Sequence, residues 1–377
     1  MRAEIITEWG RFDALEPEWN PLLSRSRADV LFLRWEWIRS WRKVLGEAVR
    51  PFAVVVRDGD GALAGVAPFY RTGYRLLRAV PYRALRIMGD FPTGAECLDW
   101  ILGKENETEA ARAVAEALSG ASGEWDFLWM PYVPRWTGGR DRIRNACAEA
   151  GFRLSEREVL FGIVSLPSSI DELVSSFGAS HRYNVRRDLK RTFGQPTTRF
   201  VRCREEGEIP RYIEALFRLH ALRWGMEGQP GTFRRKPNEA RFYREFAPEA
   251  HRRGWLGLYG VEMSGDLKAV QYGYLYNGSF LQMQEGLDQE SGRGMGNLLR
   301  LKVMDDLIGG GIRSYDFLGE LSEHKQRWHI RERMGSHLMV GNGKMKSRFL
   351  FANGIWPTGR YLRHADAERL RGAEGEN

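Results

Sequence analysis

The clearest alternation of apolar and polar positions lies between residues 255 and 328. Three segments there alternate with a period of two, which predicts strands, and Asn277-Gly278 between the second and third is typical of a hairpin turn. These segments are 256–263, 269–276 and 279–287. A glycine-rich turn follows them, and 298–310 then has the pattern of a helix. We therefore predict three antiparallel strands, a turn, a helix and a further strand at 314–318.

The turn before this helix reads SGRGMGN, residues 291–297. Such a turn at a helix N-terminus directs unpaired backbone N–H groups at one place, where the helix dipole adds partial positive charge. Glycine permits positive φ and close approach, and Arg293 adds a charge that can pair with phosphate. A glycine-rich connection without a ligand is the alternative, but the strand before and the helix after favour a pyrophosphate cradle. Its candidate residues are Gly292, Arg293, Gly294, Met295, Gly296 and Asn297.

The order of elements excludes two well-known owners of such a loop. A dinucleotide-binding unit has its glycine turn after the first strand of a parallel βαβ unit, whereas three antiparallel strands come first here. A Walker loop has a lysine followed by serine or threonine after its glycines, and this sequence has neither there.

The segment GRGMGNLL, residues 292–299, resembles the acyl-CoA pyrophosphate loop of GNAT acyltransferases, which usually reads R or Q, x, x, G, x, G. Ser291 stands at the Arg or Gln position, and a shifted frame that begins at Gln289 also fits the pattern. Three further segments resemble the cellulose-biosynthesis-type (CelD-like) acetyltransferases. They are HRYNVRR at 181–187, QEGLD at 284–288 and YDFLGELSEHKQRW at 315–328.

This resemblance covers most of residues 28–340 and departs in the last segment. The family tends to show Gly, a few residues and then Tyr-Lys, whereas here His324 precedes Lys325 with one extra residue after Gly319. The resemblance implies an α/β (α+β) fold of two tandem GNAT-like domains, each a mixed, mostly antiparallel sheet flanked by helices.

A hairpin predicted at 51–73 is similar to the later one and suggests an internal duplication. No glycine-rich turn occurs at the matching place of the first half, which is therefore expected to lack a cofactor loop. The predicted domains are 1–166, 167–342 with the acyl-CoA site, and a basic aromatic tail at 343–377.

Composition fits an ordinary enzyme. The 377 residues suffice for two domains, and 43% apolar residues with 13 Trp argue against disorder. No apolar run is long enough to span a membrane, and the N-terminus lacks the features of a secretory signal. Three widely spaced cysteines suggest neither a disulfide framework nor a metal cluster, so we expect a cytoplasmic protein without a metal. The net charge of +8 implies anionic partners without choosing among CoA, nucleic acid and lipid.

The segment 180–194 predicts a strongly basic helix in which Asp188 is the one acid. Something must offset the repulsion among its cations, either solvent or a bound anion. The phosphates of CoA, an anionic acceptor and RNA all remain open. We select Arg182 and Arg186 as substrate-binding candidates.

Charged side chains follow the strand predicted after the glycine-turn helix, and strand ends at a cleft often carry chemistry. Acyl transfer to an amine needs a base for the amine proton and can use an acid for the leaving thiolate. His324 is the candidate base, Glu320 or Asp316 would orient it, and His181 competes for the role. The alternative is a structural ion pair between Asp316 and Lys325, with His324 on the surface.

We therefore predict an acyl-CoA-dependent N-acyltransferase. Acetyl-CoA or a longer acyl-CoA is the donor, and an amine on a small molecule, sugar or lipid is the acceptor. The thioester would lie beside strand 282–287, whose backbone N–H groups can polarise its carbonyl. Further candidates are Gln284 and Lys325 for the donor and Tyr272, Tyr274 and Gln282 for the acceptor walls, with core packing as their alternative.

The tail 343–372 mixes cations with aromatic residues. Such a segment either lies peripherally on an anionic membrane, here its inner face, or docks on the body of the protein. Two rival functions stay open. One is a Fem-type transferase, which shares the doubled fold but takes its acyl group from charged tRNA; the other is a non-catalytic module that binds nucleic acid or anionic membrane.

Overall fold

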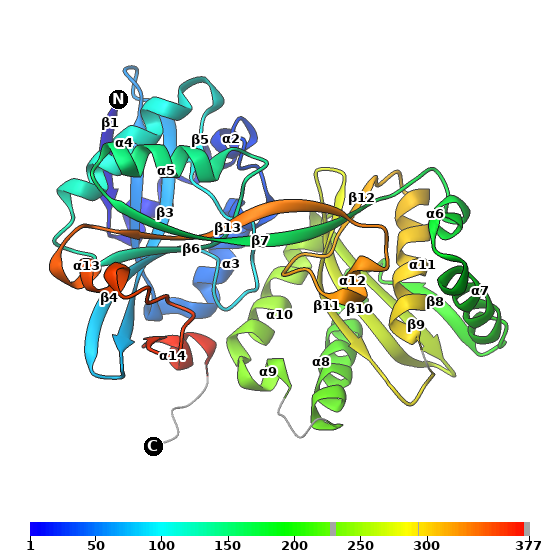
Figure 1. Cartoon of the computed structure of the whole chain (residues 1–377). Helices are drawn as coiled ribbons and strands as arrows, with labels where there is room; N and C mark the ends of the chain where they lie inside the picture. The colour runs from blue at the N-terminus through cyan, green and yellow to red at the C-terminus, as the bar shows by residue number, and fades with distance from the viewer. Residues whose placement is uncertain (227–230, 293, 373–377) are drawn as a thin grey trace. The chain divides into compact units, whose positions relative to one another are not determined.

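The computed structural model describes residues 1–226, 231–292 and 294–372. The chain forms two compact units (Figure 1). The first contains Met1–Val159 and Met334–Asn377, and the second contains Leu160–Arg333. The C-terminal segment thus clusters with the first unit.

The first unit has a sheet in the order β1-β2-β3-β4-β6-β13. Its neighbours are antiparallel except β4 and β6, which are parallel. The strands are β1 (Arg2–Ile6), β2 (Arg50–Arg57), β3 (Leu63–Leu76), β4 (Val80–Ile87), β5 (Ile101–Leu102), β6 (Phe127–Pro134), β13 (Arg331–Gly341) and β14 (Leu362–His364). The helices are α1 (Trp9–Asp13), α2 (Glu16–Ser24), α3 (Trp35–Leu45), α4 (Glu107–Gly120), α5 (Gly139–Glu149), α13 (Met345–Ala352) and α14 (Ala367–Arg371).

The second unit has a sheet in the order β7-β12-β11-β10-β9-β8. Only β11 and β12 run parallel among its paired strands in the described residues. The strands are β7 (Arg153–Ser165), β8 (Thr198–Arg202), β9 (Leu256–Met263), β10 (Asp266–Tyr276), β11 (Ser279–Leu287) and β12 (Ser314–Asp316). Strand β7 begins in the first unit, which includes its residues up to Val159, and only its end belongs to the second. The helices are α6 (Ile170–Ser176), α7 (Ala179–Phe193), α8 (Ile209–Met226), α9 (Thr232–Arg235), α10 (Pro237–Arg252), α11 (Met295–Gly309) and α12 (Glu323–Gln326).

The same sequence of elements occurs in both units. Strands β2, β3 and β4 are antiparallel, α4 follows, and β6 returns parallel to β4. Strands β9, β10 and β11 are likewise antiparallel, and α11 leads to β12, parallel to β11. The predicted fold class, two α/β domains with mixed, mostly antiparallel sheets flanked by helices, is confirmed.

Each sheet receives a strand from the other half of the chain. Strand β13 follows the second repeat in sequence and pairs with β6, while the end of β7 follows the first repeat and pairs with β12. A sequence-local reading of hairpins does not reveal this exchange, because the partners are far apart along the chain.

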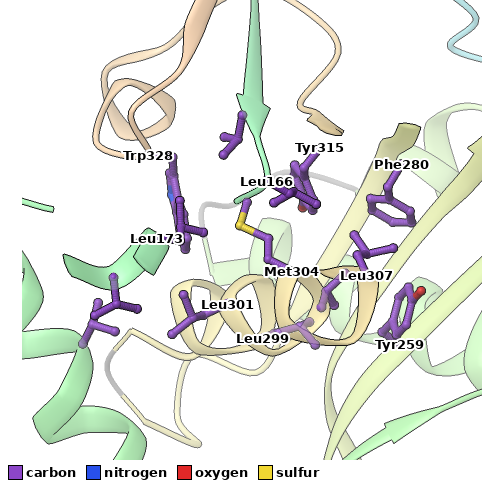
Figure 2. Close-up of a cluster of buried hydrophobic side chains, with 14 of the residues drawn as sticks. Leu166, Leu173, Tyr259, Phe280, Leu299, Leu301, Met304, Leu307, Tyr315 and Trp328 are labelled. Atoms are coloured by element: carbon purple, nitrogen blue, oxygen red, sulfur yellow. The ribbon is translucent and has the colours of Figure 1, made fainter. Parts of the chain in front are cut away.

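Helix α11 is the centre of the second unit's core (Figure 2). Leu299 and Met304 pack in one buried cluster with Tyr259 of β9. The next residue, Gly260, faces Tyr212 of α8, because neighbouring strand residues point to opposite faces. Helix α11 therefore covers one face of the sheet and α8 the other. Among the described residues, no helix is long and apolar enough to cross a bilayer.

Candidate functional site

The glycine-rich turn joins β11 to the N-terminus of α11. Gly294 is the residue before the helix and has φ 82°, and Gly292 has φ 137°. Residues with a Cβ rarely adopt this left-handed region, so the turn requires glycine at both positions. The helix begins at Met295, three residues before the predicted start at Leu298. The prediction places all three glycines in the turn, whereas Gly296 belongs to the helix. Arg293 lies outside the described residues.

The third glycine permits close packing of helix on strand. A Cβ at Gly296 would lie 2.8 Å from Leu287 Cδ1 and 2.9 Å from Glu285 Oε1, closer than real Cβ contacts. Asp288 holds the other side of the turn, since its carboxylate accepts hydrogen bonds from Ser291 Oγ at 2.7 Å and from the Glu290 amide at 3.0 Å. These bonds lower the pKa of Asp288, and the hydrogen bond from the Ser291 hydroxyl has the largest effect.

A cavity of about 410 Å³ lies at this helix N-terminus. A helix of 15 residues supplies unpaired first-turn N–H groups and a partial positive charge at the cavity. Every described residue of the predicted cradle lines it. The lining residues are Glu285, Leu287, Asp288, Gln289, Gly292, Gly294, Met295, Gly296, Asn297 and Arg300.

The basic helix α7 lies beside the glycine turn. A Cβ at Gly294 would be 3.7 Å from Asp188 Oδ2, so the middle of α7 borders the cradle. Arg187 and Arg191 both pair with Asp188 Oδ1, at 3.0 and 3.5 Å, and about half of each arginine side chain is exposed. The structure therefore puts exposed guanidinium groups next to a helix N-terminus, which joins two features that the sequence left separate.

Strands β11 and β12 part beside this cavity. They pair in parallel only at residues 279–281 with 314–316. From Gln282 onward, this edge of β11 has no partner strand among the described residues. The pairing of β10 with β11 also shifts register between Tyr272 and Gly273, so Met283 has no opposite residue. A splayed, bulged strand leaves backbone N–H and C=O groups available to an extended ligand.

A buried polar network lies beneath the parted strands. Arg300 donates to both carboxylate oxygens of Glu285, at 3.1 and 2.9 Å, and Gln271 donates to Glu285 Oε2 at 3.1 Å. The hydroxyl of Tyr315 donates to Gln282 Oε1 at 2.8 Å. Burial disfavours the charged form of Arg300, but the Glu285 carboxylate outweighs it and raises the Arg300 pKa.

Sequence reasoning missed this network. The one sign of it in the sequence is a single cation, Arg300, which stands between Leu299 and Leu301 and is buried with them in α11. A buried arginine needs an acid close by, and Glu285 on the preceding strand was the candidate.

The predicted charged residues lie at the end of β12, in the loop that follows it and in the short helix α12. Asp316 is buried and accepts a hydrogen bond from the Leu318 amide at 3.0 Å, and burial raises its pKa. Lys325 Nζ donates to the carbonyls of Leu318 at 2.6 Å and Glu320 at 3.1 Å, so this cation holds the loop together. The backbone of His324 belongs to α12, but its side chain lies outside the described residues.

His181 lies at the start of α7 among aromatic rings. Its ring centroid is 4.8 Å from that of Phe177 and 6.2 Å from that of Trp328. Its Nε2 is buried and has no hydrogen-bond partner among the described residues. Burial lowers the pKa of His181, and the nearby Arg327 and His329 lower it further, so the ring is neutral at pH 7.

The predicted acceptor residues are divided between different places. The hydroxyls of Tyr272 and Tyr274 are 2.7 Å apart, and both side chains are fully buried on the face that packs against α10. Gln282 belongs to the polar network described above. Arg182 donates to the Ser175 carbonyl at 2.9 Å, and Arg186 is exposed on α7. Gln284, predicted for the donor, lies opposite Tyr272 on β11.

A protein-family model matches the part of the chain that contains this site. Residues 179–326 match the acetyltransferase (GNAT) domain. The match includes α7, the glycine turn, α11 and the loop after β12. This part of the second unit is therefore similar to a GNAT acetyltransferase domain, and the comparisons do not specifically show the CelD-like group. No curated protein matches the chain.

Solved structures resemble most of the chain, across both units. The structure of FemX has a TM-score of 0.61 at 13% identity and covers 93% of this chain and 99% of that one. The C-terminal domain of a putative lysylphosphatidylglycerol synthetase from Agrobacterium fabrum has a TM-score of 0.52 at 13% identity and covers 89% and 96%. L-PGS from Bacillus licheniformis has a TM-score of 0.50 at 11% identity and covers 85% and 96%. At these identities the likeness establishes the fold.

Proposed function

We propose that this protein is an acyl-CoA-dependent N-acyltransferase whose donor site is the cavity at the N-terminus of α11. The observation that carries the proposal is that the glycine turn and the first turn of α11 line one cavity. Asp188 of α7, with its partners Arg187 and Arg191, lies beside the same turn. Backbone N–H groups, a helix dipole and guanidinium groups together are suited to a diphosphate. Acetyl-CoA and longer acyl-CoA species carry this group.

The carboxylates at the cavity are already compensated. Glu285 is paired with Arg300, and Asp288 is bound by the turn itself, with Lys268 Nζ at 3.6 Å. An incoming diphosphate would therefore meet little uncompensated negative charge. Asp188 is paired as well, and its partners Arg187 and Arg191 can turn toward a phosphate without leaving the surface.

The parted strands provide a path for the rest of the donor. We infer that the pantetheine arm pairs with the open edge of β11 and that the thioester lies near the bulge at Met283. Backbone N–H groups there would stabilise the negative charge that develops on the carbonyl oxygen. The Glu285–Arg300 network fixes β11 to α11, so cradle and bulge keep their spacing.

The reaction itself requires one bond exchange. The amine nitrogen attacks the thioester carbonyl carbon, the C–N bond forms, and the C–S bond breaks with departure of the CoA thiolate. His181 and His324 are the proposed bases for the amine proton, and the thiolate takes a proton as it leaves. His181 is our first candidate, since its Nε2 has no hydrogen-bond partner among the described residues and its lowered pKa keeps the ring neutral at pH 7.

Titration calorimetry tests the donor assignment without knowledge of the acceptor. The purified chain is titrated with acetyl-CoA, palmitoyl-CoA and free CoA. We expect micromolar binding of all three, because the diphosphate is common to them, and a difference between the two acyl species reports the acyl length preferred. Failure of all three ligands to bind contradicts the proposal.

A second candidate is an aminoacyl transferase that takes its acyl group from charged tRNA. The exposed cations of α7 favour it, because a run of arginines on one helix is suited to an RNA backbone. Its test is tRNA binding in the same preparation. Tight, salt-dependent tRNA binding in the absence of any CoA binding would favour this candidate over the first.

A further inference from the structure

The first unit has one surface on which exposed apolar side chains gather. Among the described residues, Leu77 is 66% exposed, Met345 85% and Phe349 49%, and Val80 and Tyr361 are nearly half exposed. These residues come from the tip of the β3–β4 hairpin and from the segment around α13, drawn in light blue and orange in Figure 1. We call these five residues, together with Arg78, Arg157, Arg348 and Arg360, the apolar cationic face.

Direct contacts hold the two segments together. Strand β14 pairs with the end of β3, and the Leu77 amide donates to the Tyr361 carbonyl at 2.8 Å. Lys346 Nζ donates to the Pro81 carbonyl at 2.8 Å. The apolar cationic face is therefore a fixed surface and not a chance approach of two loose segments.

The backbone at the tip of the β3–β4 hairpin is strained. Leu77 and Arg78 have φ of 50° and 65°, a region that bulky side chains rarely adopt and in which Asn or Gly would be unstrained. The sequence nevertheless puts an exposed leucine and an exposed arginine there. Such an outlier at an exposed turn suggests that the side chains themselves have a function.

A cavity of about 490 Å³ opens within this face. Leu76, Ile355 and Trp356 supply apolar walls, and Arg157 and Arg360 supply its charges. The guanidinium of Arg157 lies 4.4 Å from the centroid of the Trp356 ring. Among the described residues, no acid lines the cavity and no ion pair includes either arginine.

The charged residues of the two segments have a single sign. Between residues 343 and 364 the chain has five cations and no acid, and residues 74–83 have three arginines and no acid. A soluble protein surface normally mixes both signs, and exposed aromatic and aliphatic residues are normally scattered. Apolar side chains inside a ring of cations match a bilayer, whose acyl region takes the first and whose anionic headgroups take the second.

We propose that the apolar cationic face docks on a membrane surface that contains anionic phospholipid. Leu77, Met345 and Phe349 enter the boundary between headgroups and acyl chains. A headgroup phosphate lies between Arg157 and Arg360, at the mouth of the cavity. This proposal is independent of the donor site, which belongs to the other unit.

Vesicle sedimentation tests the proposal on the full chain. Vesicles of pure phosphatidylcholine are compared with vesicles that also contain phosphatidylglycerol, at low and high salt. We expect binding to the anionic vesicles only, weakened by salt. The triple variant Leu77→Ser, Met345→Ser, Phe349→Ser should reduce the affinity more than tenfold, because it removes most of the apolar area available for insertion. Arg360→Gln should reduce it about fivefold, the loss expected for one cation near such a surface.

Leu222→Ser is the matched control, because Leu222 is a half-exposed leucine of the second unit. It should leave vesicle binding unchanged, and all the variants should keep the circular dichroism spectrum of the parent because every changed side chain is exposed. Equal binding to neutral and anionic vesicles overturns the proposal, as does an equal loss in Leu222→Ser. Binding that soluble heparin abolishes and that the triple variant retains would also overturn it, in favour of a nucleic-acid partner.

Discussion

Replacement of Gly294 by valine should abolish the donor cradle while leaving the fold intact. Gly294 precedes α11 with φ 82°, and the nearest atom to a new Cβ, Asp188 Oδ2, is 3.7 Å away. The effect is therefore backbone strain and not a clash. A left-handed conformation costs an L-residue about 1–2 kcal/mol, more for a β-branched one, and the turn can relieve this strain by rotating its N–H groups away from the cavity.

The expected loss of affinity follows from those N–H groups. A hydrogen bond to a charged group contributes about 1.5–3 kcal/mol, so misorientation of one N–H should raise the dissociation constant of acetyl-CoA roughly tenfold to hundredfold. Calorimetry measures this directly. Thermal unfolding should show a stability loss of about 1–2 kcal/mol, the strain that the turn does not relieve.

Gly309→Ala provides the matched control. Gly309 ends the same helix, and a Cβ there would meet nothing within 4 Å. This variant should bind acetyl-CoA within a factor of two of the parent, because it leaves the N-terminus of α11 unchanged. Undiminished binding by Gly294→Val, or an equal loss in both variants, would refute the reasoning.

Further predictions concern the buried charges and the cradle. Arg300→Leu should destabilise the fold by about 3 kcal/mol in urea unfolding, because the largely buried Glu285 loses its cation and keeps only the neutral Gln271 as a donor. Adding Glu285→Leu should recover much of that loss, and no recovery would contradict the pairing. Gly296→Ala should weaken donor binding at least tenfold, since its Cβ would displace Glu285 or Leu287, and unchanged binding would exclude close packing there. Glu156 in the first unit has a pKa that burial raises but that hydrogen bonds from Arg140 and its neighbours lower to about 2. The contribution of the Glu156 carboxylate to folding stability is therefore complete above pH 4.5 and is lost as pH falls through 2. Glu156→Gln should lower the free energy of unfolding by about 2 kcal/mol at pH 7, after allowance for solvent screening, and by progressively less in acid. A difference in unfolding free energy that does not change with pH would contradict the lowered pKa.

Local patterns predicted most of the second unit. The alternation of residue types at 256–287 predicted the strands β9, β10 and β11, although helices cover both faces of this sheet and bury both sides of β9. The glycine turn and the helix after it were likewise predicted, with an error of three residues in the helix start. Glycine spacing reveals a turn, but it does not reveal which glycine begins the helix.

The rest depends on contacts between distant segments. Tyr272 and Tyr274 were selected as acceptor walls because alternation shows that side chains share a face without showing which face; the structure puts both against α10. The pairing of Glu285 with Arg300 requires the packing of α11 on β11, which no local pattern contains. The contact between Asp188 and the glycine turn similarly joins segments about a hundred residues apart.

The central claim is that an acyl-CoA diphosphate binds at the N-terminus of α11. Amide hydrogen exchange, measured by mass spectrometry with and without acetyl-CoA, tests it most directly because it locates the ligand on the chain. The account predicts slowed exchange in peptides that cover 282–300 and in the middle of α7, with the first unit unchanged. Slowed exchange only elsewhere, or none at ligand concentrations that saturate binding, would contradict it.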